Sequence, residues 1–132
     1  MQRLTRPIIL FADDDPLARA IAKKVAESMN VSLVLAEDGE KALALVHEHR
    51  PDLLVTDALM PKLDGREVAR IAKDANAECK VVIITSVYKD PRYKHEAYKN
   101  FKVDEYVLKP ITPEKLKEVF AKHLGKGGAA AT

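Results

Sequence analysis

The sequence predicts an α/β domain built on a doubly wound parallel sheet, with helices on both faces. Five short apolar runs recur along the chain, and segments with helical periodicity separate them. Several runs are apolar at every position, which is typical of strands that are covered on both faces. Strands that alternate with helices favour parallel pairing through right-handed crossovers. Together these observations predict one domain of three layers.

The predicted strands are short and rich in β-branched and other apolar side chains. They lie at residues 8–11, 33–35, 53–55, 81–84 and 106–108. Most of the segments between and after them carry one apolar face with helical spacing. The residues that define these faces are Leu17, Ile21 and Val25; Ala42, Leu45 and Val46; Val68, Ile71, Ala72 and Ala75; and Leu116, Val119, Phe120 and Leu124. Residues 93–101 form the weakest predicted helix, because charged side chains crowd a poor apolar face.

Three of the predicted helices begin with a capping signal. Asp15 and Thr112 each stand directly before a proline, which suits the first helical position. Asp64 precedes a glutamate by three residues, which is the spacing of a capping box. These signals place helix starts shortly after the first, third and fifth strands.

The composition limits the chain to one core and to few kinds of protein. It has 132 residues, 47% of them apolar, and a formal net charge of +2, which gives no strong attraction to nucleic acid or to a membrane. The single cysteine, Cys79, cannot form an internal disulfide, and no apolar run approaches the roughly 20 residues of a membrane span. We therefore expect a cytoplasmic protein with one domain at residues 1–124. Residues 125–132, rich in glycine and alanine, are expected to be a flexible tail or the start of a linker.

Polar residues follow four of the five predicted strands. Asp13 and Asp14 follow the first strand, Asp57 follows the third, and Thr85 and Lys109 follow the fourth and fifth. The carboxyl ends of parallel strands meet at one edge of a sheet, which is where such folds bind their ligands. We therefore expect these five side chains to lie close together.

Three crowded carboxylates at that edge would repel one another. Two such charges about 5 Å apart cost roughly 3 kcal/mol at an effective dielectric constant near 20. Lys109 can offset part of this repulsion, and a hard divalent cation can offset more. Because the donors are oxygens, the sequence favours Mg²⁺, with Mn²⁺ as the alternative, over zinc. A metal-held carboxylate is a competent nucleophile toward phosphorus, and the Thr85 hydroxyl could hydrogen-bond a phosphoryl oxygen.

A purely structural role is the alternative for each of the acidic residues. Helix capping alone explains Asp15, but it explains too little at Asp13 and Asp14. Asp57 has no predicted helix to cap, because Pro61 follows four residues later. A chemical role is therefore favoured for Asp13, Asp14 and Asp57.

Four spaced motifs follow one another along the chain, at residues 9–16, 57–65, 83–86 and 106–110. Any one of them alone would be weak, but in this order the chain resembles the receiver domains of two-component response regulators, in particular chemotaxis regulators. The resemblance covers roughly residues 7–124. It implies the flavodoxin-like three-layer sandwich with strand order 2-1-3-4-5.

The resemblance also implies a phosphoryl-transfer role for the edge residues. Asp57 would accept a phosphoryl group from a phosphohistidine, and Lys109 and Thr85 would contact that group. The peptide bond between Lys109 and Pro110 would be cis. Thr85 would swing toward the phosphoryl group and Tyr106 would follow inward from solvent. This movement would change an output surface made by the fourth helix, fifth strand and fifth helix.

The metal and the partners are implied in the same way. Asp14, Asp57 and the main-chain carbonyl of Leu59 would bind Mg²⁺ directly, and Asp13 would act through a water molecule. The domain would be a switch rather than an enzyme, assisting only its own phosphorylation and slow dephosphorylation. Its partners would be a sensor histidine kinase or phosphotransfer protein, and a downstream protein target or a fused output domain. A phosphorylation-dependent homodimer is an open alternative, whereas nucleic-acid or membrane binding is not expected.

Three positions depart from the pattern of the family. Lys102 stands where the family has a glycine that ends the fourth helix in a left-handed conformation, which lysine tolerates poorly. We therefore predict that the helix ends nearer Asn100, a better left-handed residue. In the family, the positions of Leu59 and Val87 help set the access of hydrolytic water, and neither of these side chains can orient water by hydrogen bonding. We hypothesise a comparatively long-lived phosphoryl group.

Two other functions fit parts of the pattern. A phosphohydrolase of the haloacid dehalogenase type also uses an aspartate, a hydroxyl, a lysine and magnesium. Leu17, however, stands where its motif requires threonine or valine, and no cap domain is apparent. A pseudo-receiver that binds partners without phosphorylation would keep the fold, but the intact Asp57, Thr85 and Lys109 argue against it.

Overall fold

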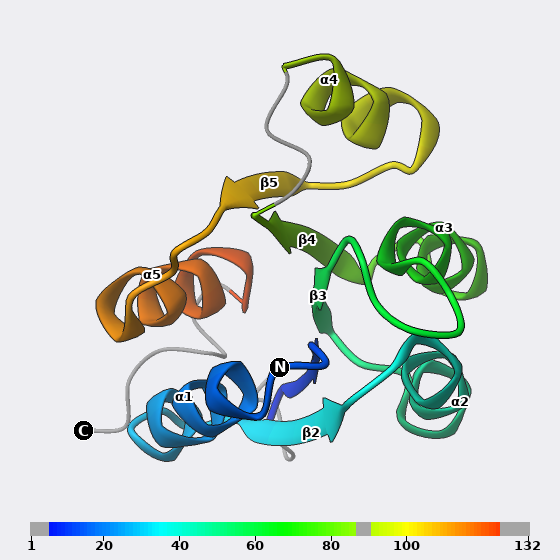
Figure 1. Ribbon diagram of the computed structural model, residues 1–132. Helices are drawn as coiled ribbons and strands as arrows, with labels where there is room; N and C mark the ends of the chain where they lie inside the picture. Colours follow the sequence, from blue (N-terminus) through cyan, green and yellow to red (C-terminus); the bar gives the residue numbers. More distant parts are fainter. Residues whose placement is uncertain (1–5, 87–90, 125–132) are drawn as a thin grey trace.

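The fold is a five-stranded parallel sheet between two layers of helices (Figure 1). The computed structural model describes residues 6–86 and 91–124. The strands are β1 (Ile8–Ala12), β2 (Ser32–Ala36), β3 (Leu53–Asp57), β4 (Lys80–Thr85) and β5 (Glu105–Leu108). The helices are α1 (Pro16–Glu27), α2 (Gly39–His49), α3 (Gly65–Ala75), α4 (Pro91–Asn100) and α5 (Pro113–Leu124). The strand order β2-β1-β3-β4-β5 confirms the predicted fold.

The two faces of the sheet bury separate apolar clusters. Successive residues of a strand point to opposite faces, so Ile9 and Phe11 pack with α1 and α5, whereas Leu10 and Ala12 pack with α2 and α3. Figure 1 shows α1 and α5 on one side of the sheet and α2 and α3 on the other. The central strand β3 is buried along its whole length. This burial on both faces explains why its sequence is not an alternating pattern.

Side-chain caps begin the helices where the sequence predicts them. Asp15 and Thr112 accept hydrogen bonds from backbone N–H groups two and three residues later, at 2.9 and 3.1 Å. Asp64 does the same at the start of α3, at 2.8 Å. Asp38 caps α2 in the same manner, at 2.8 Å, and was not predicted.

The end of α4 matches the prediction in part. The helix ends at Asn100, which confirms its predicted end, but the residue with positive φ is Lys102 (φ 56°), so the expectation that Asn100 would take this conformation is wrong. The Val103 N–H reaches back to the carbonyl oxygen of Ala97, at 3.2 Å, and closes the helix end around residue 102. Because Val103 is buried in the core, the chain must turn at Lys102 despite the strain.

Some predictions lie outside the described residues. Residues 125–132 and Val87 are among them, so the tail and the role of Val87 stay predictions. Within the described ranges, no helix is long and apolar enough to cross a membrane.

Candidate functional site

The predicted polar residues meet at the carboxyl edge of the sheet. Asp57 is the last residue of β3 and Thr85 is the last residue of β4, while Asp13 and Lys109 directly follow β1 and β5. The parallel register of neighbouring strands brings these ends side by side. The strand ends that carry these residues therefore lie side by side, as expected from the sequence.

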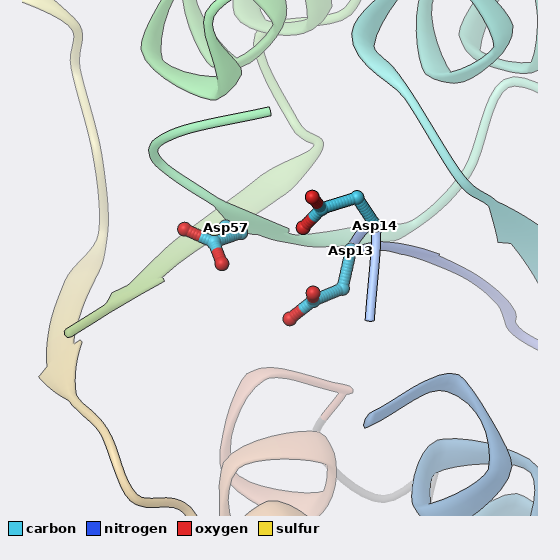
Figure 2. Close-up of side chains that lie close together, drawn as sticks. All are labelled: Asp13, Asp14 and Asp57. Carbon is cyan, nitrogen blue, oxygen red and sulfur yellow. The ribbon is translucent and has the colours of Figure 1, made fainter. Parts of the chain in front are cut away.

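Three carboxylates form a tight cluster at this edge. Asp13, Asp14 and Asp57 each offer an oxygen atom, and these atoms lie within 4.8 Å of one another. Figure 2 shows the three side chains gathered at the ends of β1 and β3. Asp13 is fully buried and Asp57 is 7% exposed, whereas Asp14 is exposed. The cluster therefore has a buried floor and one carboxylate open to solvent.

Lys109 bridges the two buried carboxylates. Its Nζ lies 2.8 Å from Asp13 Oδ2 and 2.8 Å from Asp57 Oδ2. Its backbone N–H donates to the carbonyl oxygen of Thr85 at 2.9 Å, which fixes the lysine to the end of β4. The peptide bond between Lys109 and Pro110 is cis, as the resemblance implied.

The pKa values show how unevenly the charge is balanced. Burial raises the pKa of the Asp13 carboxyl above its ordinary value, even though hydrogen bonds from Lys109 and from the Asp15 N–H oppose the shift. Burial alone would lower the pKa of Lys109, but its hydrogen bonds to Asp13 and Asp57 outweigh burial and raise that pKa. One ammonium thus stays charged among three acidic groups, and negative charge is left over.

The backbone around Asp57 is held by contacts that the sequence analysis missed. The Thr56 hydroxyl donates to the Asp57 carbonyl oxygen at 3.0 Å, and the Gly65 N–H donates to the carbonyl oxygen of Ala58 at 2.9 Å. A β-carbon at Gly65 would lie 1.8 Å from the Asp57 carbonyl oxygen, so no side chain fits there. The glycine directly after the Asp64 cap was the only available signal.

Comparison with known proteins assigns the family. Residues 9–121 match the family model of the response regulator receiver domain. The chain belongs to this family. Among relatives, the response regulator MprA of Mycobacterium leprae (strain TN) is 34% identical over 108 residues, which is 82% of this chain and 46% of that protein. The chain thus spans about half the length of the curated relatives it matches.

Solved structures agree with this assignment. The receiver domain of the Francisella response regulator 1452 is 31% identical, with a TM-score of 0.74, and the match covers 86% of this chain and 92% of that one. A CheY-like receiver domain protein from Methanospirillum hungatei has a TM-score of 0.83 at 22% identity, covering 93% and 97% of the two chains. The second likeness is one of fold alone.

The acidic cluster of this receiver fits a hard divalent cation. All the side-chain donors are carboxylate oxygens, which suit Mg²⁺ and exclude a typical zinc site. Within the described residues, three carboxylates outnumber the one ammonium, that of Lys109, which contacts two of them. A cation would remove this imbalance, and the exposed Asp14 leaves one side of the cluster open to it.

Two further predicted residues take positions that refine the expectation. The Leu59 N–H donates to Asp57 Oδ1 at 3.1 Å, and its side chain is exposed, so the loop after β3 wraps the carboxylate. Tyr106 is buried, with 6% of its surface exposed, and its inward movement on phosphorylation stays a prediction. It packs in the same cluster as Ala97 and Val103, and its register partner on β4 is Ile83, two residues before the fully buried Thr85. The structure therefore gives the inward position of the ring.

Proposed function

We propose that this receiver accepts a phosphoryl group on Asp57 from a sensor histidine kinase or a phosphotransfer protein. The observation that carries the proposal is the bridge from Lys109 to Asp13 and Asp57, with a third carboxylate at Asp14 beside it. A carboxylate ordered by an ammonium and by the Leu59 N–H is held in one geometry for attack.

The proposed transfer forms one bond and breaks one. An oxygen of the Asp57 carboxylate bonds to phosphorus as the P–N bond of a phosphohistidine breaks, and that electron pair stays on the imidazole nitrogen, which takes up a proton. Lys109 lies against Oδ2 of Asp57, where the negative charge of the transferring group would gather. The Thr85 hydroxyl would donate to a phosphoryl oxygen.

The metal site in this proposal uses the same cluster. Asp14, Asp57 and the main-chain carbonyl of Leu59 would hold Mg²⁺, or Mn²⁺ in its place, and Asp13 would act through a water molecule. When bound, the cation supplies positive charge against the phosphoryl oxygens. Its charge also allows the three carboxylates to stay ionised together.

The consequence of phosphorylation would be a change in an output surface. Thr85 and Tyr106 would act as the switch, and α4, β5 and α5 would form the surface that a downstream protein or a fused output domain recognises. The domain would act as a switch whose own chemistry is limited to phosphorylation and slow dephosphorylation. A homodimer formed on phosphorylation, and a location in the cytoplasm, remain part of this expectation.

Intact mass spectrometry after incubation with acetyl phosphate and Mg²⁺ tests the proposal. We expect one added phosphoryl group on the wild-type chain and none on Asp57→Asn. The matched control is Asp15→Asn, which alters the acidic loop but keeps a residue that can cap α1. A wild-type chain that stays unmodified would favour the pseudo-receiver, and a phosphorylated Asp57→Asn would place the acceptor elsewhere.

A further inference from the structure

Helix α4 is the least firmly packed helix of the described chain. Ala97 is its only buried residue among those whose side chains are described, whereas α1, α2, α3 and α5 each bury at least three. Figure 1 shows α4 at the far end of the molecule, beyond β5. With so little apolar burial, polar contacts carry a larger share of what fixes the helix in place.

One arginine from another helix reaches α4 at two points. The Arg66 guanidinium donates to Glu96 of α4 at 3.2 Å, and its Cζ lies 5.4 Å from the centre of the Phe101 ring. Phe101 follows the last residue of α4 and packs on the core cluster that contains Tyr106. Arg66 is well shielded, with 17% of its side chain exposed. It therefore contacts both the body and the end of α4.

Further contacts of the Arg66 guanidinium tie it to the loop between Asp57 and α3. Arg66 lies in the first turn of α3, and two of its guanidinium nitrogens donate to the capping carboxylate of Asp64, at 3.3 and 3.2 Å. The residue before it, Gly65, contacts the Asp57 carbonyl so closely that no β-carbon fits. A shift in the backbone of Asp57 would thus displace the backbone of Gly65 and, with it, that of Arg66.

We propose that Arg66 is a positioning residue that couples the state of Asp57 to the position of α4. This inference rests on the proposed phosphorylation of Asp57. A planar guanidinium can bridge Asp64 and Glu96 while stacking on Phe101, which a lysine ammonium cannot do. Arg66→Lys therefore keeps the charge but loses the fork and the stacking, and Glu96→Gln breaks the ionic contact from the α4 side.

Hydrogen exchange with a phosphoryl mimic tests the coupling. Amide exchange of residues 91–103 is measured with and without beryllofluoride and Mg²⁺, and binding of the mimic is followed separately by ¹⁹F NMR. In the wild type we expect the mimic to change α4 exchange. In Arg66→Lys and Glu96→Gln the mimic should still bind, while its effect on α4 exchange falls about two- to fivefold, as expected for loss of a partly exposed ion pair at a coupled equilibrium.

Arg70→Lys is the matched control. Arg70 lies one turn further along α3 and pairs with Glu67 and Asp74, both on α3 itself, so this change should leave the α4 response at its wild-type size. A purely structural role for Arg66 would speed α4 exchange equally with and without the mimic, and that result would overturn the coupling. So would a full wild-type response in both variants, or a wild-type α4 that ignores bound mimic. Failure of the wild type to bind the mimic at all would instead remove the proposed function, and the coupling with it.

Discussion

The two ends of the sheet hold carboxylates in opposite ways. At the amino end, Asp52 and Asp104 each precede a strand, and each accepts a hydrogen bond from the first or second backbone N–H of a neighbouring strand, at 2.8 Å. Asp104 also pairs with Lys73 at 2.8 Å. At the carboxyl end, Asp13 and Asp57 share one lysine and stand beside a third acid. At the amino end the carboxylates link neighbouring strands by hydrogen bonds, whereas at the carboxyl end they concentrate negative charge.

The pKa directions express the same difference. Burial alone would raise the pKa of Asp104, but hydrogen bonds from Lys73 and the Val81 N–H outweigh it and hold that pKa below its ordinary value. At the carboxyl end, burial wins and raises the pKa of Asp13. Folding thus favours the ionised form of Asp104 and disfavours the ionised form of Asp13. A carboxylate whose ionised form weakens the fold, and which nonetheless stands beside two other acids, suggests a task other than stability.

The largest difference between the ends should come from removing each lysine. Lys109→Met leaves Asp13 and Asp57 buried without their ammonium and should lower the free energy of unfolding by about 3 kcal/mol, the lower end of what breaking a buried pair costs. Lys73→Met should cost only about 1 kcal/mol, because Asp104 keeps its bond from Val81. Urea unfolding without divalent cation measures both. Equal losses would mean that the two ends hold their charge alike.

A smaller effect, with a pH signature, is expected at Asp104. Asp104→Asn should cost about 1–2 kcal/mol at neutral pH, since hydrogen bonds to a charged acceptor are lost or weakened. The pKa of Asp104 is lower in the folded chain than its ordinary value of 3.8, so its contribution is present above that value and is lost as the pH falls through the folded pKa. Unfolding free energies of both proteins, measured across the acid range, should therefore converge at low pH. A difference in unfolding free energy between the two proteins that grows as the pH falls would contradict the stabilising interactions of ionised Asp104 with Lys73 and the Val81 N–H.

The opposite sign is expected for the acidic cluster. Without divalent cation, Asp14→Asn should stabilise the fold by about 0.5–1 kcal/mol, because it removes repulsion and no hydrogen bond in the described chain. Asp57→Asn should also stabilise it, by less, since that change weakens the contact with Lys109. Added Mg²⁺ should raise the melting temperature of the wild type and have little effect on either variant. A loss of stability in Asp14→Asn would show that the cluster is not a repulsive one.

The sequence predicted the arrangement at the carboxyl end of the sheet far better than the arrangement at the amino end. The apolar runs placed Asp13, Asp57 and Lys109 at strand ends, and parallel topology then required them to meet. Nothing in the local sequence marks Asp52 or Asp104 in this way, because their role depends on which strand lies beside them. Pairings across the fold are set by tertiary packing, which no local periodicity encodes.

The buried position of the Tyr106 ring and the turn at Lys102 both depend on tertiary packing rather than on local sequence. The expectation for the ring came from the behaviour implied by the family, whereas its position depends on how α4 packs over β5. Likewise, intrinsic preference favoured Asn100 for the left-handed residue, but burial of Val103 fixes the turn two residues later. Propensity is a weak guide where a buried side chain decides the path of the backbone.

The smallest predicted effect concerns that turn, which lies away from the acidic cluster at the carboxyl end of the sheet. Lys102→Gly should stabilise the fold by roughly 0.5 kcal/mol, because glycine relieves the positive φ of 56° but adds entropy to the unfolded chain. Losing the ion pair between Lys102 and Asp74, which is 4.0 Å long and exposed on both sides, should change the free energy of unfolding very little. Lys99→Gly, inside α4, should instead destabilise by about 1 kcal/mol. Urea unfolding should give the same gain in the free energy of unfolding for Lys102→Gly with and without Mg²⁺, because strain at this turn is independent of charge at the carboxyl end. A gain that depends on Mg²⁺ would show that the turn and the acidic cluster are coupled.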